Sequence, residues 1–271
     1  MNSSLYRKLV RKIYSQEFIR KIMIDFYKSK VKHHFNKAHK TYDEYCVMQN
    51  DASQRALELL VQHSSHFKTI ADFACGTGES TLRLIKQIKY ERCYAIDFSD
   101  KLLGMAINKL PGTVNCIISD FDEPLFIDNF LDLIFCNMGL QWSLGLGKTL
   151  SILNGYLKED GYFAFSMPVA GNFPEIKTEF KPLLLSCDRI AYILRSNGFN
   201  MIHHYGYKNI QLFESHYHAL KSLKAIGANY SPGFNNKGLK KENIRAIFVD
   251  NCITPQLTYC IGIYLCQKPS L

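Results

Sequence analysis

The chain has 271 residues, of which 47% are apolar and 21% are charged, and its formal net charge is +9. This length predicts one domain with additions, and the apolar fraction is ample for a hydrophobic core. The composition excludes collagen-like, repetitive and broadly disordered chains. The longest strongly apolar run near the end of the sequence, residues 257–266, is too short for a membrane-spanning helix, which needs about 20 residues.

Nine cysteines occur without a Cys-x-x-Cys spacing. An odd number of cysteines without paired spacing favours reduced thiols, and therefore a cytoplasmic location. Histidines occur in three pairs, at 33 and 34, 203 and 204, and 216 and 218. None of these pairs belongs to a ligand pattern that includes a carboxylate, so no metal site is expected.

The positive charge is concentrated at the start of the chain. Residues 1–40 carry eleven lysines and arginines against Glu17 and Asp25, whereas the rest carries 22 basic and 22 acidic residues. Apolar residues recur there at near-helical spacing, at Leu5, Leu9, Ile13, Ile19, Ile22, Met23 and Phe26. This pattern predicts a basic amphipathic helical arm over residues 1–30.

Four interpretations of the arm remain open: a docked helix with a solvated basic face, a landing surface for an acidic partner, weak contact with a membrane surface, and an organellar presequence. No nucleic-acid-binding module is visible, so nucleic acid is not an expected partner.

The most informative stretch is TIADFACGTGES, residues 69–80. An apolar run over 70–74 predicts a buried strand, the glycine-rich turn Cys75-Gly76-Thr77-Gly78 follows, and a helical pattern starts at Glu79. Glycine in such a turn tolerates positive φ and lets backbone N–H groups approach a ligand closely.

Polar residues also follow the next three predicted strands. A strand over 94–97 ends in Asp97, 19 residues after Gly78, and a strand over 114–119 is followed by Asp120. A strand over 131–136 is followed by Asn137. Open α/β sheets bind ligands at the carboxyl ends of their strands, and an acid about 20 residues after a glycine-rich turn commonly holds ribose hydroxyls.

These motifs resemble class I S-adenosylmethionine-dependent methyltransferases. The first motif of that family is D-x-G-x-G-x-G, which corresponds here to residues 72–78 with Ala74 in place of the first glycine. The extra methyl is expected to be tolerated if Ala74 has a negative φ, and Cys75 is interpreted as a packing residue. The resemblance implies that Asp97 binds the ribose and that Asp120 and Phe121 flank the adenine. The implied cofactor-binding residues are Asp72, Ala74, Cys75, Gly76, Gly78, Asp97, Phe98, Asp120, Phe121 and Asn137.

The implied fold is α/β: a Rossmann-like, mostly parallel sheet with an antiparallel last strand, a helical cap insertion and the N-terminal arm. Residues 31–271 would form one methyltransferase domain, with cap elements at about 168–200 and 214–250. We expect cap helices over 173–185, 188–195, 215–226 and 241–248, a turn-rich link over 230–238, and final strands over 201–213 and 257–267.

Three further segments resemble the malonyl-acyl-carrier-protein O-methyltransferases of biotin synthesis: residues 137–142 (NMGLQW), 171–175 (GNFPE) and 219–229 (ALKSLKAIGAN). The resemblance covers roughly residues 31–268. It implies transfer of a methyl group from S-adenosylmethionine to the free carboxylate of a malonyl group on an acyl carrier protein.

That carboxylate is ionised at pH 7, so the reaction needs no strong general base. Gln141 and Trp142 are expected on the acceptor side, and Tyr42 is the candidate lid contact over the cofactor. Lys221 and Lys224 lie one turn apart on the predicted cap helix and are candidates for holding the substrate carboxylate, although each could equally be a solvated surface residue.

Three alternatives use the same motifs. The chain could methylate a quinone or another small molecule without a carrier. It could also resemble the complex I assembly factors that share this fold and perform hydroxylation, or it could be a non-catalytic scaffold that does not bind S-adenosylmethionine.

Overall fold

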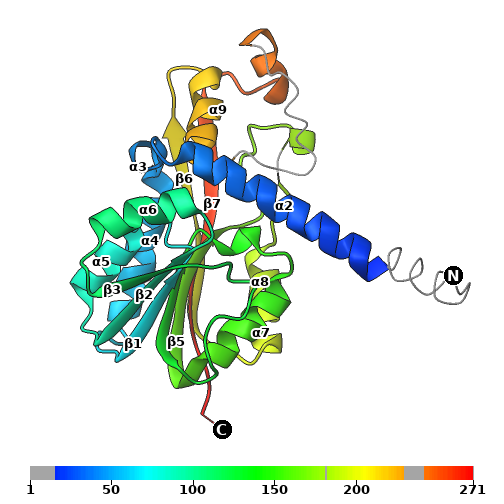
Figure 1. Ribbon diagram of the computed structural model, residues 1–271. Coiled ribbons are helices and arrows are strands. Elements are labelled where there is room, and N and C mark those ends of the chain that lie inside the picture. The colour runs from blue at the N-terminus through cyan, green and yellow to red at the C-terminus, as the bar shows by residue number, and fades with distance from the viewer. Residues whose placement is uncertain (1–15, 181, 229–240, 271) are drawn as a thin grey trace, which may run out of the picture.

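A seven-stranded sheet forms the centre of the protein in a computed structural model that describes residues 16–180, 182–228 and 241–270 (Figure 1). The strands are β1 (Thr69–Phe73), β2 (Arg92–Asp97), β3 (Val114–Ile118), β4 (Leu131–Asn137), β5 (Leu157–Pro168), β6 (Asn200–Leu212) and β7 (Gln256–Gln267). Their order across the sheet is β3-β2-β1-β4-β5-β7-β6, and β7 runs antiparallel to both of its neighbours. The predicted mostly parallel sheet with an antiparallel last strand is therefore confirmed.

Helices cover both faces of the sheet because successive strand residues point to opposite sides. In β4, Leu133 and Phe135 belong to one core cluster, and Ile134 and Cys136 belong to the other. The first cluster is completed by α4 (Val47–Val61), α5 (Glu79–Gln87) and α6 (Asp100–Lys109), and the second by α7 (Leu146–Tyr156) and α8 (Cys187–Ser196). This three-layer arrangement leaves the carboxyl ends of β1 to β4 at one edge of the sheet.

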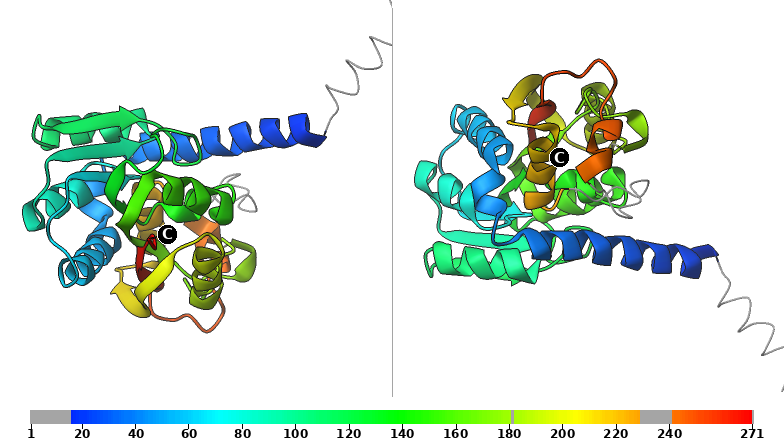
Figure 2. Two further views of the ribbon diagram at one scale, coloured as in Figure 1. Left: turned by 90° about the horizontal axis from the view of Figure 1, so that it is seen from below. Right: turned by 90° about the horizontal axis from the view of Figure 1, so that it is seen from above.

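The N-terminal helix α2 (Gln16–Ala38) runs without a break past residue 30, where the sequence pattern suggested that the arm ends. Its last turns bury Val31, Phe35 and Ala38, and the helix packs against α6. Its earlier turns extend beyond the rest of the protein (Figure 2). The predicted arm residues 1–15 lie outside the described residues. A short helix, α3 (Tyr42–Tyr45), then connects α2 to α4.

The cap differs from the prediction. The expected helix over 173–185 is wrong, because the described residues form only a 3-10 turn over Thr178–Phe180. Backbone groups of this segment bond elsewhere: the N–H of Phe173 donates to Thr258, and the N–H of Lys177 donates to Ile247. The α-helix of the cap is α9 (His216–Ala225), and Lys241–Ile247 is a 3-10 helix.

The expected cap range of 168–200 also includes α8, which packs on the sheet rather than in a cap. Ile190 and Leu194 of α8 lie in the core cluster that contains Phe163 and Phe165 of β5. The predicted link over 230–238 lies outside the described residues. Among the residues described, no helix combines the length and apolar character that crossing a bilayer requires.

The Gly78 position should be intolerant of any side chain. Gly78 has φ +81, and an added Cβ would lie 3.0 Å from Cβ of Ala106 and 3.1 Å from Cγ of Leu110. We expect Gly78→Ala to lower the free energy of unfolding by about 1–3 kcal/mol, because a non-glycine residue in this region is strained. Urea denaturation measures this change.

Gly104→Ala is the matched control, because Gly104 lies within α6 and an added Cβ there meets nothing within 4 Å. It should raise the free energy of unfolding by about 0.5–1 kcal/mol through helix propensity. Equal effects of the two substitutions would contradict this account of the α5–α6 contact.

Candidate functional site

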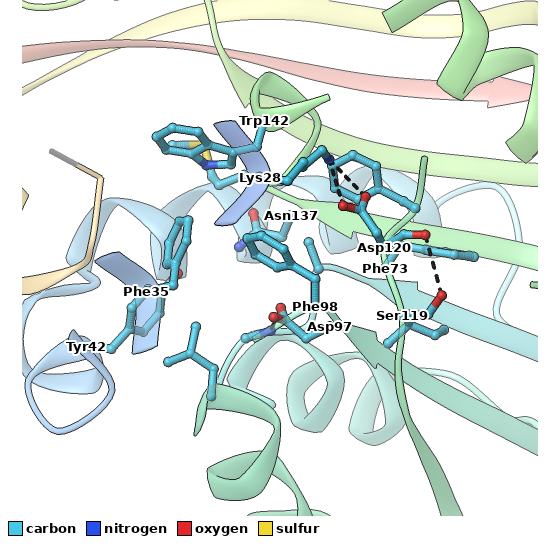
Figure 3. A pocket seen from close by; sticks show the side chains of 17 residues that line it. Lys28, Phe35, Tyr42, Phe73, Asp97, Phe98, Ser119, Asp120, Asn137 and Trp142 are labelled. Atoms are coloured by element: carbon cyan, nitrogen blue, oxygen red, sulfur yellow. Dashed lines mark hydrogen bonds and ion pairs between the residues drawn. The ribbon is translucent and has the colours of Figure 1, made fainter. Parts of the chain in front are cut away.

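A narrow cavity lies at the carboxyl ends of β1, β2 and β4 and of the segment that follows β3, and α2 closes one side of it (Figure 3). Its volume is about 40 Å³. The lining residues are Lys28, Phe35, Tyr42, Phe73, Ala74, Gly76, Ile96, Asp97, Phe98, Leu102, Ser119, Asp120, Phe121, Asn137, Met138, Gly139 and Trp142. The structure thus brings together seven of the ten predicted cofactor-binding residues, and we call this space the first cavity.

The turn after β1 has left-handed backbone at Ala74, Gly76 and Gly78. Ala74 has φ +57, as has Gly76, so the negative φ on which tolerance of the Ala74 methyl was made to depend does not occur. The methyl of Ala74 has room because residue 139 is glycine: a Cβ on Gly139 would lie only 2.5 Å from Cβ of Ala74. Gly139 was not singled out in the sequence, because its importance depends on this contact across two strands.

Asp97 is a buried carboxylate at the end of β2. One oxygen, Oδ2, accepts from the N–H of Gly76 at 2.8 Å, and Oδ1 accepts from the N–H of Ser99 at 2.7 Å. Burial raises the pKa of Asp97 to about 6, while these two hydrogen bonds act in the opposite direction. Each oxygen keeps a second lone pair, so Asp97 can still accept hydrogen bonds from a ligand in the first cavity.

Asp72 lies beside the turn but does not line the first cavity. Its Oδ2 accepts from the hydroxyls of Ser80 at 2.8 Å and Thr81 at 2.6 Å, in the first turn of α5. Burial raises the pKa of Asp72 to about 7. Because side chains alternate along β1, Asp72 faces α5, whereas the neighbouring Phe73 reaches the cavity. Asp72 therefore joins β1 to α5, a different place from the one implied by the family resemblance.

Cys75 and Gly78 are likewise absent from the cavity lining. Cys75 is buried with its N–H donating to Ile96, and burial raises the pKa of its thiol well above the usual value. A protonated thiol of this kind is a poor nucleophile, as expected for a packing residue. Gly78 instead allows α5 to approach α6.

Asp120 and Phe121 line the first cavity together with Lys28 of α2, and Figure 3 shows Lys28 next to Asp120. The Lys28 ammonium lies 2.9 Å from Asp120 and 4.7 Å from the centroid of the Phe121 ring. Phe98 contacts Phe35 of α2 edge to face, with 6.0 Å between the ring centroids. Neither Lys28 nor Phe35 was a predicted site residue: Lys28 belongs to the predicted arm, and Phe35 lies in the predicted domain but outside its recognised motifs.

Asn137 and Tyr42 also lie in this cavity. The Asn137 amide donates to the backbone oxygen of Gln49 at 2.9 Å and accepts from the Ser166 hydroxyl at 2.6 Å. Tyr42 approaches the turn, since a Cβ on Gly76 would lie 4.0 Å from the phenol oxygen. Burial raises the pKa of Tyr42, so its phenol stays protonated. Its position in the lining is compatible with the predicted lid contact.

A second cavity of about 660 Å³ lies next to the first, and we call it the second cavity. Met138 and Trp142 line both cavities, and Gln141 lines the second. The Gln141 amide donates to the oxygen of Met138 at 2.6 Å. Gln49, which sequence analysis missed, also lines the second cavity, and its Oε1 atom is buried without a partner among the described residues.

Lys221 and Lys224 do not join this group. Both side chains are exposed, and neither lines the first or the second cavity. The reason is their position on α9, whose opposite face buries Ala219 and Ser222 and presents Leu223 and Ile226 toward the second cavity. Their predicted role in holding a carboxylate therefore has no support from this geometry.

No group of three or more histidine, cysteine, aspartate or glutamate side chains that could hold a metal ion occurs within residues 16–180, 182–228 and 241–270. The buried carboxylates of the site instead accept hydrogen bonds from backbone N–H groups and hydroxyls.

Comparisons with known proteins agree with the fold and the motifs. Residues 71–165 match a family described as a methyltransferase domain. The chain is 38% identical over 251 residues to malonyl-(acyl-carrier protein) O-methyltransferase 2 of Coxiella burnetii, covering 91% of this chain and 99% of that protein. It is 25% identical over 238 residues to the enzyme of the same name from Geobacter sulfurreducens, covering 82% and 88%.

Among solved structures, the N-methyltransferase NodS from Bradyrhizobium japonicum, in complex with S-adenosyl-L-homocysteine, has a TM-score of 0.51 at 12% identity. The match covers 81% of this chain and 87% of that one. At this identity the likeness concerns the fold.

The raised pKa of Asp97 predicts a pH-dependent affinity for S-adenosylhomocysteine, the demethylated form of the cofactor that the motifs predict. Ribose hydroxyls donate hydrogen bonds, so binding favours the ionised carboxylate. Below about pH 6 the free protein carries a proton on Asp97 that must leave on binding. We expect the dissociation constant to rise by up to about tenfold per pH unit below this value. Calorimetric titration between pH 5 and 8 measures it.

Asp97→Asn should bind S-adenosylhomocysteine more weakly at every pH, because an amide has one acceptor oxygen for two backbone N–H groups. Its affinity should show no inflection near pH 6. An unchanged inflection in Asp97→Asn would assign the titration to another group.

Proposed function

The chain belongs to the family of malonyl-(acyl-carrier protein) O-methyltransferases, and we propose that it transfers a methyl group from S-adenosylmethionine to the free carboxylate of a malonyl group carried by an acyl carrier protein. The product is the malonyl methyl ester, formed at an early step of biotin synthesis. S-Adenosylmethionine supplies an electrophilic methyl group on a sulfonium, and the leaving group is the neutral thioether.

The observation that carries this proposal is the wall shared by the two cavities. Met138 and Trp142 line both of them, so the two cavities are adjacent at these side chains, and the cofactor methyl and the acceptor would meet there if the side chains move apart. A methyl transfer needs this arrangement, because the acceptor oxygen must lie in line with the breaking bond and water must be kept away. The larger second cavity is mostly apolar in its lining and would keep water away from the malonyl thioester.

The first cavity has the residue types that suit the cofactor. Asp97 would accept hydrogen bonds from the ribose hydroxyls, and Asp120 would accept one from the adenine amino group. Phe98 and Phe121 would supply apolar contact on either side of the base. The protonated phenol of Tyr42 would act as a hydrogen-bond donor near the glycine turn. These assignments follow the cavity lining, so Asp72, Cys75 and Gly78 receive structural roles instead.

The second cavity would orient the acceptor without deprotonating it. A malonyl carboxylate is already ionised at pH 7, so its oxygen can attack directly. Gln141 and Gln49 offer amide groups on the cavity wall, and Gln141 is held by its bond to Met138. The amide of Gln49 would donate to the carboxylate when its nitrogen faces the cavity.

We also place the reaction in the cytoplasm and without a metal. Support for the location comes from the nine cysteines, all of which are described and free. The attack of a carboxylate on a sulfonium methyl requires no Lewis acid.

The direct test is intact-mass analysis of malonylated carrier protein after incubation with this protein and S-adenosylmethionine. We expect a gain of one methyl group that mild base or an esterase removes, as a methyl ester requires. Unmalonylated carrier protein is the control and should gain nothing. Binding of S-adenosylmethionine without methylation of the malonyl group would overturn the acceptor and favour a quinone or another small molecule. Failure to bind the cofactor at all would favour a scaffold.

We further propose that the early turns of α2 dock the carrier protein. Ile19, Ile22, Met23 and Phe26 lie on one face of α2 and are between 46% and 66% exposed. The spacing i, i+3, i+4, i+7 is that of helices that present an apolar face to a partner. The excess positive charge of the chain lies in the same segment, within residues 1–40, and this favours an acidic partner such as a carrier protein.

Charge reversal on α2 tests this docking. Lys21→Glu together with Lys30→Glu should raise KM for malonylated carrier protein about three- to tenfold at low salt, because electrostatic steering is lost. The increase should shrink at high salt, since exposed charges are screened. Activity on a malonyl thioester without a carrier should stay unchanged.

Lys86→Glu with Lys89→Glu is the matched control, because both side chains are exposed at the opposite edge of the sheet. This variant should leave KM within about twofold of the unmodified protein. A similar loss in both double variants would show that net charge alone, rather than the α2 surface, determines the affinity.

A further inference from the structure

Among the lysines that form ion pairs in the described residues, Lys28 has the least exposed side chain. It lies at the cofactor end of the site. Its ammonium is 2.9 Å from both carboxylate oxygens of Asp120 and 2.7 Å from Oδ2 of Asp122. The side chain of Lys28 is 14% exposed, and those of Asp120 and Asp122 are 19% and 11% exposed. Figure 3 shows the ammonium of Lys28 directed at Asp120 at the edge of the first cavity.

This burial distinguishes Lys28 from an ordinary surface lysine. On the same helix, Lys32 pairs with Asp100 at 3.2 Å, but those side chains are 38% and 42% exposed. Exposed pairs contribute little, whereas removal of one partner from a buried pair leaves an uncompensated charge. Without Lys28, the largely buried carboxylates of Asp120 and Asp122 would repel each other.

The ion pair continues into a network that reaches the second cavity. The N–H of Asp122 donates to Asp120 at 3.0 Å, which fixes the turn after β3. The Asp122 carboxylate accepts from the Thr149 hydroxyl in α7 and from the N–H of Leu144 at 3.1 Å. Leu144 lines the second cavity. Lys28 thus connects α2, the loop after β3 and the segment before α7.

The helix that carries Lys28 also covers both cavities. Phe35 of α2 lines the first cavity and Tyr27 lines the second. With a volume of about 40 Å³, the first cavity holds only a few water molecules in this conformation, since one water needs roughly 10–15 Å³ by the same measure. Movement of α2 away from this cavity would break the Lys28 ion pair, together with the Lys32–Asp100 ion pair and the hydrogen bonds of Asn36 with Ser99 and Asp100.

We propose that Lys28 is a positioning residue for adenine recognition: it holds the Asp120 carboxylate in place toward the first cavity and fixes α2 over the bound nucleoside. The inference rests on the proposed cofactor but not on the proposed acceptor. The Lys28 charge is already balanced by two carboxylates, so it serves the cofactor end of the site rather than the substrate carboxylate. Adenine presents an amino donor to Asp120, whereas hypoxanthine presents a carbonyl oxygen that the carboxylate repels.

The test compares S-adenosylhomocysteine with S-inosylhomocysteine, in which a carbonyl oxygen replaces the C6 amino group and N1 carries a proton, by calorimetric titration without any acceptor. The unmodified protein should prefer the adenosyl compound. Lys28→Met should weaken its binding about tenfold and affect the inosyl compound much less, so the preference should fall. Lys28→Arg should restore the preference, because it keeps the charge next to both carboxylates. Lys32→Met is the matched control on the same helix and should change both affinities by less than about twofold.

Two outcomes would overturn the proposal. If Lys28→Met binds both compounds as the unmodified protein does, the ion pair is irrelevant to recognition. If it weakens both compounds equally, Lys28 supports the fold of α2 without positioning Asp120. Thermal unfolding of each variant separates loss of folding from loss of recognition. Either failure leaves the methylation of malonylated carrier protein untouched, because that reaction is measured with the acceptor present.

Discussion

The site depends on a hydrogen bond between a carboxylate at the end of one strand and the turn that follows the neighbouring strand. Asp97, at the end of β2, accepts from the N–H of Gly76 in the turn after β1 and from its own neighbour Ser99. These bonds hold a left-handed turn against the ligand cavity. They also compensate part of the desolvation that burial imposes on the carboxylate, which explains why a charged group persists there. Asp72 makes the corresponding connection from β1 to the start of α5.

Two buried acids, Asp72 and Asp97, therefore have different roles. Asp72 accepts hydrogen bonds from hydroxyls of α5 and faces away from the first cavity, whereas Asp97 lines it. Because side chains alternate along β1, Asp72 contacts α5 while the adjacent Phe73 lines the first cavity. Helix α2 then encloses the site, because it passes over the edge where the strands end. A segment near the start of the chain thus covers a site whose other residues lie mainly between positions 73 and 142.

Much of this architecture could be predicted from the sequence. The strand ends marked by Asp97, Asp120 and Asn137 all come to one edge of the sheet, because parallel strands share direction. The site partners were harder to predict because they are remote in sequence. Lys28 and Asp120 are 92 residues apart, and the residues of the Asn137–Gln49 hydrogen bond are 88 apart. Periodicity reports local structure, and it gave no signal that α2 would pack over the cofactor end.

The errors in the cap have a tertiary cause. Apolar spacing over 173–185 suggested a helix, but the backbone there bonds to the segment before β7 and to the 3-10 helix at Lys241–Ile247. On α9, Lys221 and Lys224 lie one turn apart as predicted, but local spacing does not determine which face of the helix is buried, and it is Leu223 and Ile226 that line the second cavity. Face direction is a tertiary property, set by what the helix packs against.

The contact between Ala74 and Gly139 limits which residues these two positions can hold. With a Cβ at both positions, the two methyl carbons would be 2.5 Å apart, so the pair accommodates only one of them. Residue 139 has φ −113, where an alanine is unstrained, whereas residue 74 has φ +57, where it is not. Alanine at both positions would therefore require the backbone of one strand end to shift, whereas glycine at both would not. Ala74 thus couples the sequence of the turn after β1 to that of the loop after β4, although the two are more than 60 residues apart.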